Sequence, residues 1–281
     1  MGSDAIILPV KNSASSFSYS FSFLPKQQRE AIKTVYEFCR ITDDLVDNKE
    51  NTQGNSQRLQ AWRMELERAL SESSKYQILN QLSSIARKFN IPVVHFYELI
   101  KGVEMDLLKN RYETFDELKE YCYHVASSVG LMCLGIFGSK NEQTKEYAIN
   151  LGIALQLTNI LRDVGIDAGY GRIYLPAEDM RKFGCSESDI LAKRNTKEFL
   201  DLMKYETERA EAFFRKAQES LPEEDRNAMF AAKIMERIYY HTLLRIKKVN
   251  YDVFSSSVHV PKVIQLLIAM KYWLKHRLFA S

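Results

Sequence analysis

The chain has 281 residues, of which 46% are hydrophobic, so it is long enough to bury a large core within one large domain or two ordinary ones. Its 39 lysines and arginines and 36 aspartates and glutamates give a formal net charge of +3, which argues against a nucleic-acid-binding surface. With 11 glycines and 6 prolines the sequence has few breakers, which favours long helices over many short strands.

The residues that most often build disulfides and zinc sites show no such pattern. The cysteines have no CxxC spacing, and we expect all four to be reduced and mostly buried in a cytosolic protein. The five histidines include no HExxH motif, so no zinc site is expected. No apolar run reaches the ~18 residues that a membrane-spanning helix requires.

In chain order, the sequence predicts an N-terminal tail at 1–12, whose first three residues resemble a cloning remnant, and then a series of helices. A polar loop is expected at 49–56, and the helical pattern breaks between 165 and 195. Helices are expected at about 25–48, 57–70, 76–89, 92–109, 114–137, 142–164, 196–219 and 223–250, with a last one after Pro261. Without repeats or a long linker, the pattern indicates one all-α domain.

The first expected helix carries an unusual acidic stretch, ITDDLVDNKE at 41–50. Its buried face is expected to follow the i+3/i+4 rhythm. The residues on that face are Ile32, Val35, Cys39, Thr42 and Val46.

A polar stripe follows the same rhythm displaced by one residue, which is about 100° of rotation. It consists of Tyr36, Arg40, Asp43 and Asp47. The stripe therefore borders the core face instead of opposing it, and Asp43 and Asp47 could share a cation.

A second stripe with the same design lies in QLTNILRDVGID, within the expected helix at 142–164 and just beyond it. It consists of Gln156, Asn159, Asp163 and Asp167, with Arg162 beside them. Like charges four residues apart destabilise a helix, and partly buried carboxylates are costly without a partner. The two stripes are explained if they face each other across a cavity with Mg²⁺ between them, since Mg²⁺ takes oxygen ligands and is shared with substrate phosphates.

Five segments resemble the squalene/phytoene synthase family over about residues 13–275. They are SSFSYSFSFLP (15–25), YEFCRITDDLVD (36–47), YCYHVASSVGLM (121–132), LQLTNILRDVGIDAGYGRIYLP (155–176) and RIYY (237–240). The resemblance implies an isoprenoid-synthase-type helical bundle around a central cavity over 13–281. It also implies a prenyltransferase that joins two isoprenoid diphosphates head to head, with Mg²⁺ neutralising the departing diphosphate.

Family analogy assigns roles to individual positions. Metal ions would be held by Asp43 and Asp47 on one side and by Asn159, Asp163 and Asp167 on the other. Diphosphate would be bound by Ser16, Ser18, Arg40, Gln156, Asn159, Arg162 and Arg172, the arginines acting as fixed fork-shaped donors. The cavity aromatics that stabilise carbocations would be Tyr36, Tyr121 and Tyr239. An apolar cavity would keep water away, with Phe17, Phe21 and Phe23 as candidate lining residues.

Some positions depart from the family pattern. Ser257 stands where the family commonly has arginine, which makes a C-terminal contact to diphosphate doubtful and leaves Lys262 as a substitute. Ser127 stands where many members have glycine. Glu104 and Asp106 match a further family segment, but an exposed acidic pair explains them equally well.

The substrate is less defined than the family. The segment at 121–138 most resembles the bacterial presqualene-diphosphate-forming branch, so the sequence favours two farnesyl diphosphates, with NADPH needed only if the reaction continues to squalene. Phytoene synthesis from two geranylgeranyl diphosphates, or dehydrosqualene synthesis, is the alternative. The pathway would be hopanoid or carotenoid biosynthesis.

The sequence also leaves two non-enzymatic functions as alternatives. One is an inactive helical scaffold or lipid carrier, and another is a membrane-surface or lipid-binding module. The last helix carries basic and aromatic residues beside Leu266, Leu267, Ile268 and Met270, which suggests peripheral contact at the inner membrane face of a cytoplasmic protein. A packed terminal helix is the simpler interpretation.

Overall fold

The computed structural model describes residues 21–46, 52–256 and 258–279, and this part of the chain contains helices and no strand. The all-α prediction is therefore confirmed. The α-helices are α2 (Lys26–Asp44), α3 (Thr52–Ser71), α4 (Gln77–Lys88), α5 (Val94–Leu108), α6 (Phe115–Cys122), α7 (Ser128–Phe137), α8 (Thr144–Gly169), α9 (Ala177–Phe183), α10 (Glu187–Leu191), α11 (Lys197–Ser220), α12 (Phe230–Lys248) and α13 (Lys262–Phe279). A π-helix spans Tyr123–Ser127, and a 3₁₀ turn spans Glu223–Asp225.

Several boundaries differ from the prediction. The helix expected at 114–137 is interrupted by the π-helix, α3 begins at Thr52 within the expected loop, and α12 begins only at Phe230. The helix expected to end at 164 continues to Gly169. Gly165 suggested a break, but a Cβ there would lie 3.1 Å from the Phe254 ring, so this glycine serves close packing inside the helix. Asp167 is consequently helical.

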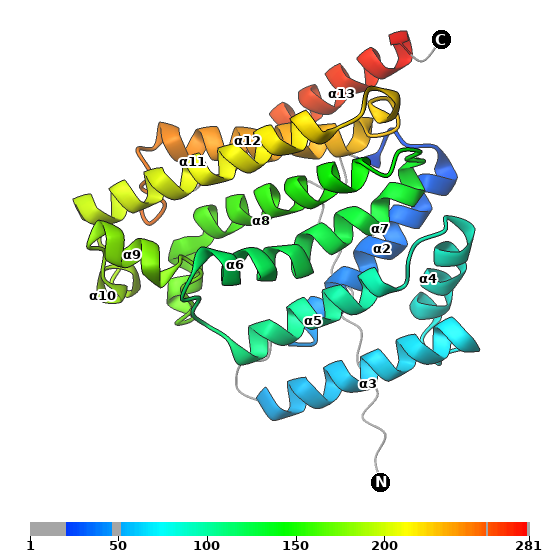
Figure 1. Cartoon of the computed structure of the whole chain (residues 1–281), viewed down its shortest axis with the longest axis horizontal. Helices are drawn as coiled ribbons and strands as arrows, with labels where there is room; N and C mark the ends of the chain where they lie inside the picture. Colours follow the sequence, from blue (N-terminus) through cyan, green and yellow to red (C-terminus); the bar gives the residue numbers. More distant parts are fainter. Residues whose placement is uncertain (1–20, 47–51, 257, 280–281) are drawn as a thin grey trace.

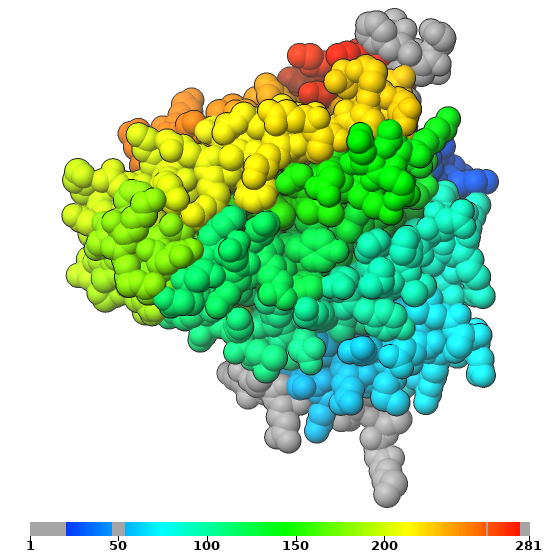
Figure 2. All heavy atoms as spheres, viewed as in Figure 1, coloured from blue at the N-terminus to red at the C-terminus, as the bar shows by residue number. Residues whose placement is uncertain are grey.

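The helices form a bundle with α8 at its centre (Figure 1). Helix α8 packs against α11, α12, α7 and the π-helix, and most of its length is buried. In Figure 1, α3 and α13 lie at opposite edges of the bundle. Figure 2 shows that side chains close the gaps between the ribbons on the face toward the viewer. A site built on α8 is therefore held on a rigid, buried element.

The carboxyl end of α2 is fixed by polar contacts to α3. The Trp62 indole donates a hydrogen bond to the Thr42 hydroxyl at 3.0 Å, and Thr42 donates to the Phe38 carbonyl at 2.7 Å. The Asn55 amide donates to the Val46 carbonyl at 3.0 Å. Thr42 and the rest of the expected apolar face are buried, as predicted. These bonds fix the rotation of α2 and therefore the direction in which Asp43 points.

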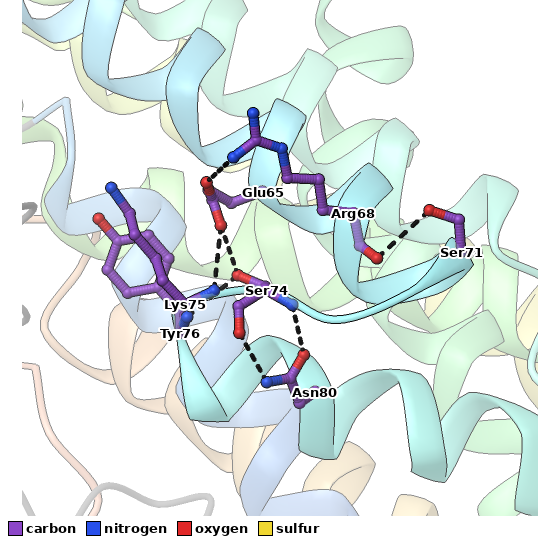
Figure 3. A network of polar contacts seen from close by, with 7 residues as sticks. All are labelled: Glu65, Arg68, Ser71, Ser74, Lys75, Tyr76 and Asn80. Atoms are coloured by element: carbon purple, nitrogen blue, oxygen red, sulfur yellow. Dashed lines mark hydrogen bonds and ion pairs between the residues drawn. The ribbon is translucent and has the colours of Figure 1, made fainter.

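The turn between α3 and α4 is organised by a buried carboxylate (Figure 3). Glu65 accepts hydrogen bonds from the Ser74 hydroxyl at 2.7 Å, the Lys75 amide at 3.3 Å and Arg68 at 2.9 Å. Burial opposes the charge of Glu65, but these donors hold its pKa below the usual value. Asn80 completes the network by bonding both backbone groups of Ser74 at 2.8 Å. The network therefore ties the start of α4 to α3.

The turn that leads into α8 is held in a similar way by Asp225. Its carboxylate accepts hydrogen bonds from the Ser139 hydroxyl at 2.8 Å, from the Lys140 and Asn141 amides at 3.0 Å, and from the Thr144 hydroxyl. Burial opposes the charge, but the hydrogen bonds hold the pKa of Asp225 below its usual value. The first turn of α8 is thus tied to the 3₁₀ turn before α12.

The four cysteines are buried free thiols, as expected from the sequence. Within the described residues, no helix is sufficiently long and apolar to cross a bilayer.

Candidate active site

A cavity of about 620 Å³ lies between α2, the π-helix, α7, α8, α12 and α13. Its polar lining residues are Tyr36, Arg40, Asp43, Tyr147, Gln156, Asn159, Arg162, Tyr239, Lys262 and Gln265. Its apolar and small lining residues include Phe21, Val125, Ala126, Val129, Gly130, Leu134, Phe137, Ala148, Leu151, Gly152, Leu155, Met229, Ala232 and Met235. The volume is in the range of small-molecule sites.

The lining changes from apolar to polar along α8. After Tyr147, whose hydroxyl donates to Glu236 at 3.2 Å, the lining residues from Ala148 to Leu155 are apolar or small. Those from Gln156 to Arg162 are polar. From residue 148 to residue 162 the helix rises about 21 Å, at about 1.5 Å per residue. Helix α12 follows the same order, from Ala232 and Met235 to Tyr239. The cavity therefore has one polar end and a long apolar remainder.

The predicted stripe on α2 lines the polar end. Tyr36, Arg40 and Asp43 all contribute to the wall, so the stripe does border the core face. Arg40 is paired with Asp44, whose Oδ1 lies 2.9 Å from its Nη2, and the Arg40 side chain is 47% exposed. Sequence reasoning missed Asp44, although its i,i+4 spacing from Arg40 was a usable signal. Asp47, the remaining member of the stripe, lies outside the described residues.

The predicted stripe on α8 lines the cavity only in part. Gln156, Asn159 and Arg162 form wall, whereas Asp163 and Asp167 do not. Arg162 Nε donates to Asp163 Oδ1 at 2.8 Å, and its Nη2 donates to the other carboxylate oxygen. Burial opposes the charge of Arg162, but this paired carboxylate raises its pKa. Asp163 therefore affects the cavity indirectly, because it orients the Arg162 guanidinium that lines it.

Tyr239 on α12 lies where the two stripes meet. It lies close enough to Asn159, Arg162 and Tyr36 for these groups to influence its ionisation. Burial raises the pKa of Tyr239, and Arg162 and Asn159 offset only part of that effect. The phenol consequently stays neutral near pH 7, and Tyr239 lines the cavity.

Oxygen donors suitable for a hard cation are present at the polar end. The Asn159 amide oxygen is buried and has no hydrogen-bond partner within the part of the chain that the structure describes. Asp43 on α2 lines the same cavity. An amide oxygen and a carboxylate fit Mg²⁺, which prefers oxygen ligands and retains waters. Among the described residues, however, no three acidic, histidine or cysteine side chains cluster closely enough to hold a metal ion.

Tyr121 and Arg172 do not line the cavity but meet at a neighbouring cluster around Asp106. The hydroxyls of Tyr121 and Tyr174 donate to the two Asp106 carboxylate oxygens at 3.1 and 2.8 Å. Arg172 Nη2 donates to the Asp106 carbonyl at 3.2 Å, and Arg172 also lies close enough to Asp167 for their charges to interact. The cluster packs the rings of Tyr112, Tyr121 and Tyr174 within 6 Å of one another.

Asp106 thus accepts hydrogen bonds from both tyrosines, a role that the sequence left undecided. Glu104, two residues before it, is exposed, whereas Asp106 is half-buried and bonded. Of the two alternatives left by the sequence, an exposed acidic pair does not describe Asp106. No local pattern revealed this, because Tyr174 comes from a segment 68 residues away.

The remaining candidates fall in several places. Phe21 lines the cavity, whereas Phe23 stacks on Trp273 with ring centroids 5.3 Å apart. Ser127, where the family resemblance led us to expect glycine, donates to the Ile149 carbonyl at 2.8 Å and links the π-helix to α8. Lys262 does line the cavity. The candidates Ser16, Ser18, Phe17 and Ser257 lie outside the described residues.

Comparison with known proteins places this architecture in a family. A profile of the squalene/phytoene synthase family matches residues 10–263. The chain belongs to the squalene/phytoene synthase family. Members of this family are prenyltransferases, so the non-enzyme interpretations of the sequence are not supported, and the family resemblance is confirmed.

The relatives include phytoene synthases and a dehydrosqualene synthase. The chain is 36% identical to phytoene synthase 3, chloroplastic, of Zea mays over 93% of its own length and 63% of that protein's length. It is 35% identical to the 15-cis-phytoene synthase of Synechococcus elongatus over 92% of its length and 88% of the relative. The crystal structure of a dehydrosqualene synthase superposes with a TM-score of 0.83 at 30% identity, covering 95% of this chain and 93% of the other.

Proposed function

We propose that the protein joins two molecules of geranylgeranyl diphosphate head to head to form phytoene, with loss of both diphosphates and two protons. The observation that carries the proposal is the cavity with one polar end and a long apolar remainder, in a chain 35–36% identical to phytoene synthases. A diphosphate head and a polyisoprenoid tail fit these two regions. The sequence alone favoured farnesyl diphosphate, and the relatives support the longer substrate better.

The two arginines on the cavity wall would bind the diphosphate. Arg162 is held in a fixed orientation by Asp163, and Arg40 is oriented by Asp44. A guanidinium whose direction is fixed loses little entropy when it binds phosphate oxygens in a bidentate manner. We expect Arg162 to position the phosphate group while Arg40, the more exposed of the two, engages it as it enters.

The metal would bind at the same end. Asp43 and Asn159 would hold Mg²⁺, with Asp47, Asp163 and Asp167 as the further candidates that the family resemblance implies. When bound, Mg²⁺ supplies positive charge that neutralises a diphosphate as its bond to the allylic carbon breaks. The orphaned Asn159 amide oxygen supports its assignment as a ligand.

The rest of the cavity would protect and steer the cationic carbon chain. Tyr36 and Tyr239 line the polar end, and their rings would stabilise an allylic cation there by cation–π attraction. Side chains such as Leu151, Leu155 and Met235 exclude water from the remainder. Tyr121 and Arg172 would contribute from the Asp106 cluster, outside the cavity wall.

A second candidate is the joining of two farnesyl diphosphates to presqualene diphosphate or dehydrosqualene, with NADPH required only for reduction to squalene. The superposition on a dehydrosqualene synthase over 95% of the chain favours it. Peripheral contact with a membrane and a cytoplasmic location also remain proposals.

The test is incubation of the purified full chain with labelled farnesyl and, separately, geranylgeranyl diphosphate, with Mg²⁺ or EDTA and with or without NADPH. A C40 hydrocarbon formed only from the longer substrate and only with Mg²⁺ is the expected result. A C30 product from farnesyl diphosphate, with no product from the longer substrate, would establish the second candidate. Absence of product from both would overturn the assignment of this cavity to prenyl transfer.

A further inference from the structure

Helix α13 presents two opposite faces, both of them apolar. One face packs inward: Ile268 and Ala269 are buried, and Trp273 stacks on Phe23. The other face is open to solvent. It exposes Val263 (68%), Leu266 (42%), Leu267 (57%), Met270 (41%) and Leu274 (50%). These five residues, which we call the α13 stripe, recur every three or four positions and therefore lie along one side of the helix.

The α13 stripe is unusual in this molecule. Exposed large apolar side chains elsewhere in the described part of the chain are spread thinly over several helices, with Met64 on α3 and Leu108 on α5 as examples. Single exposed apolar residues need no explanation, whereas a continuous exposed row marks an interaction surface. In Figure 1, α13 lies at the edge of the bundle beside α12.

The charge of α13 identifies the kind of partner. Between residues 262 and 279 the sequence contains no aspartate or glutamate. Lys262, Lys271 and Lys275 are exposed, and the sequence adds Arg277. A helix with an apolar face and only positive charge has the composition of one that lies in the interface of an anionic bilayer. The exposed lysines near the α13 stripe would meet lipid phosphates while the stripe enters the acyl region.

The same helix also forms part of the cavity wall. Lys262 and Gln265, in its first turn, line the cavity. Gln265 is only 8% exposed and donates to the Val260 carbonyl at 2.8 Å, so the start of α13 is firmly seated. The surface that would meet lipid is thus separated from the cavity by the thickness of a single helix.

We propose that the α13 stripe and the lysines near it dock the protein on an anionic lipid bilayer, and that prenyl substrate and product pass between bilayer and cavity beside α13. The movement of substrate and product between bilayer and cavity rests on the proposed function, since only long-chain lipid substrates require it. Docking shortens the path over which an apolar chain would be exposed to water.

The docking is tested by sedimentation of the full chain with vesicles of phosphatidylcholine alone and of phosphatidylcholine mixed with phosphatidylglycerol. We expect binding to the anionic vesicles that weakens with salt. The variant Val263→Ser/Leu267→Ser should bind about tenfold more weakly or worse, because two apolar side chains no longer enter the membrane. The matched control is Val94→Ser/Leu108→Ser on α5, where two similarly exposed side chains lie outside the α13 stripe; it should bind like the parent.

Other outcomes would overturn the docking proposal. They are equal binding by the α13 and α5 variants, no binding by the parent chain, or a dimer in light scattering that the α13 variant abolishes. The last result would assign the α13 stripe to a second copy of the chain. Circular dichroism confirms that each variant is folded.

Activity separates this proposal from the proposed function. With substrate dispersed in detergent, the α13 variant should turn over like the parent, whereas with substrate supplied in anionic vesicles its rate should fall with its binding. Loss in both assays would contradict the passage, since it would show a general defect. If the parent chain makes no product at all yet binds vesicles through the α13 stripe, the docking stands and the proposed function fails.

Discussion

The guanidinium of Arg162 lies on the cavity wall while the residue that follows it, Asp163, holds it through two hydrogen bonds, of which the Nε–Oδ1 bond is 2.8 Å long. Both side chains are 25% exposed. The acidic residue of the family motif is therefore coupled to the basic one within this structure, and the two should be tested as a unit.

Replacing Asp163 with Asn should lower kcat/KM by about a hundredfold or more, because the amide cannot fix the guanidinium in a charge-assisted bidentate pair. The matched control is Asp201→Asn, which breaks an exposed pair with Lys197 and should leave activity unchanged. Steady-state kinetics and circular dichroism check the result. Retention of parental activity by Asp163→Asn would contradict the coupling.

Asp43 and Asp44 are adjacent, but their substitution should have different effects on the kinetics. Asp43 lines the cavity, whereas Asp44 pairs with Arg40. We expect Asp43→Asn to abolish turnover even at saturating Mg²⁺, with the helical fold intact, because a cavity carboxylate is lost. Asp44→Asn should mainly raise KM, since it loosens the arginine that engages the substrate. Equal effects on kcat in the two variants would be inconsistent with these positions.

Asp106→Asn should lower the free energy of unfolding by about 1–3 kcal/mol, because the tyrosine hydroxyls lose a charged acceptor in a largely buried cluster. Urea unfolding followed by circular dichroism measures the change. The control is Glu104→Gln, an exposed acidic residue on the same helix, which should change stability by no more than about 0.5 kcal/mol. Equal free energies of unfolding for the two variants would show that the Asp106 cluster does not stabilise the fold.

The pH dependence of stability should report on Glu206. Its carboxylate lies 2.7 Å from Arg209, which also bonds Asp179 at 2.7 Å, and the side chain is only 3% exposed. Burial raises the pKa of Glu206 to about 8, an effect that Arg209 opposes and Asp179 reinforces. Because the pKa is higher in the folded than in the unfolded state, the contribution of this group is fully present below its ordinary pKa near 4.5.

That contribution is lost as the pH rises through about 8. The free energy of unfolding of the parent chain should therefore fall between pH 6 and pH 9 in urea titrations, and the slope should be shallower in Glu206→Gln. An unchanged slope would show that another group titrates in this range.

The apolar end of the cavity should set the chain length. Ala232 and Met235 lie on the α12 wall before Tyr239. Ala232→Leu adds volume there and should shift the ratio of kcat/KM toward farnesyl over geranylgeranyl diphosphate, by about tenfold, since pocket differences of this size are worth about 1–3 kcal/mol. Met235→Ala should shift the ratio the other way. Comparison of the two substrates within each variant is the control, and an unchanged ratio in both would place the length determinant elsewhere.

The sequence alone predicted most of the helices, the family and the face of α2 that lies beside the core. A helix places residues at fixed angles, so the spacing of Tyr36, Arg40 and Asp43 was enough to put them on one face beside the core, where the cavity lies. Oxygen donors repeated at helical spacing also led to the prediction of a hard-cation site, which remains a proposal.

Only the packing of the helices determines which of these side chains line the cavity and which bond to other side chains instead. The carboxylate of Asp163 is held by Arg162, and Tyr121 is held by Asp106 beside Tyr174. The π-helix that brings Val125 and Ala126 to the wall also left no periodic signal. Local spacing fixes the direction of a side chain from its own helix, but its partner depends on how other helices pack, and that packing is specified by contacts between residues far apart in the sequence.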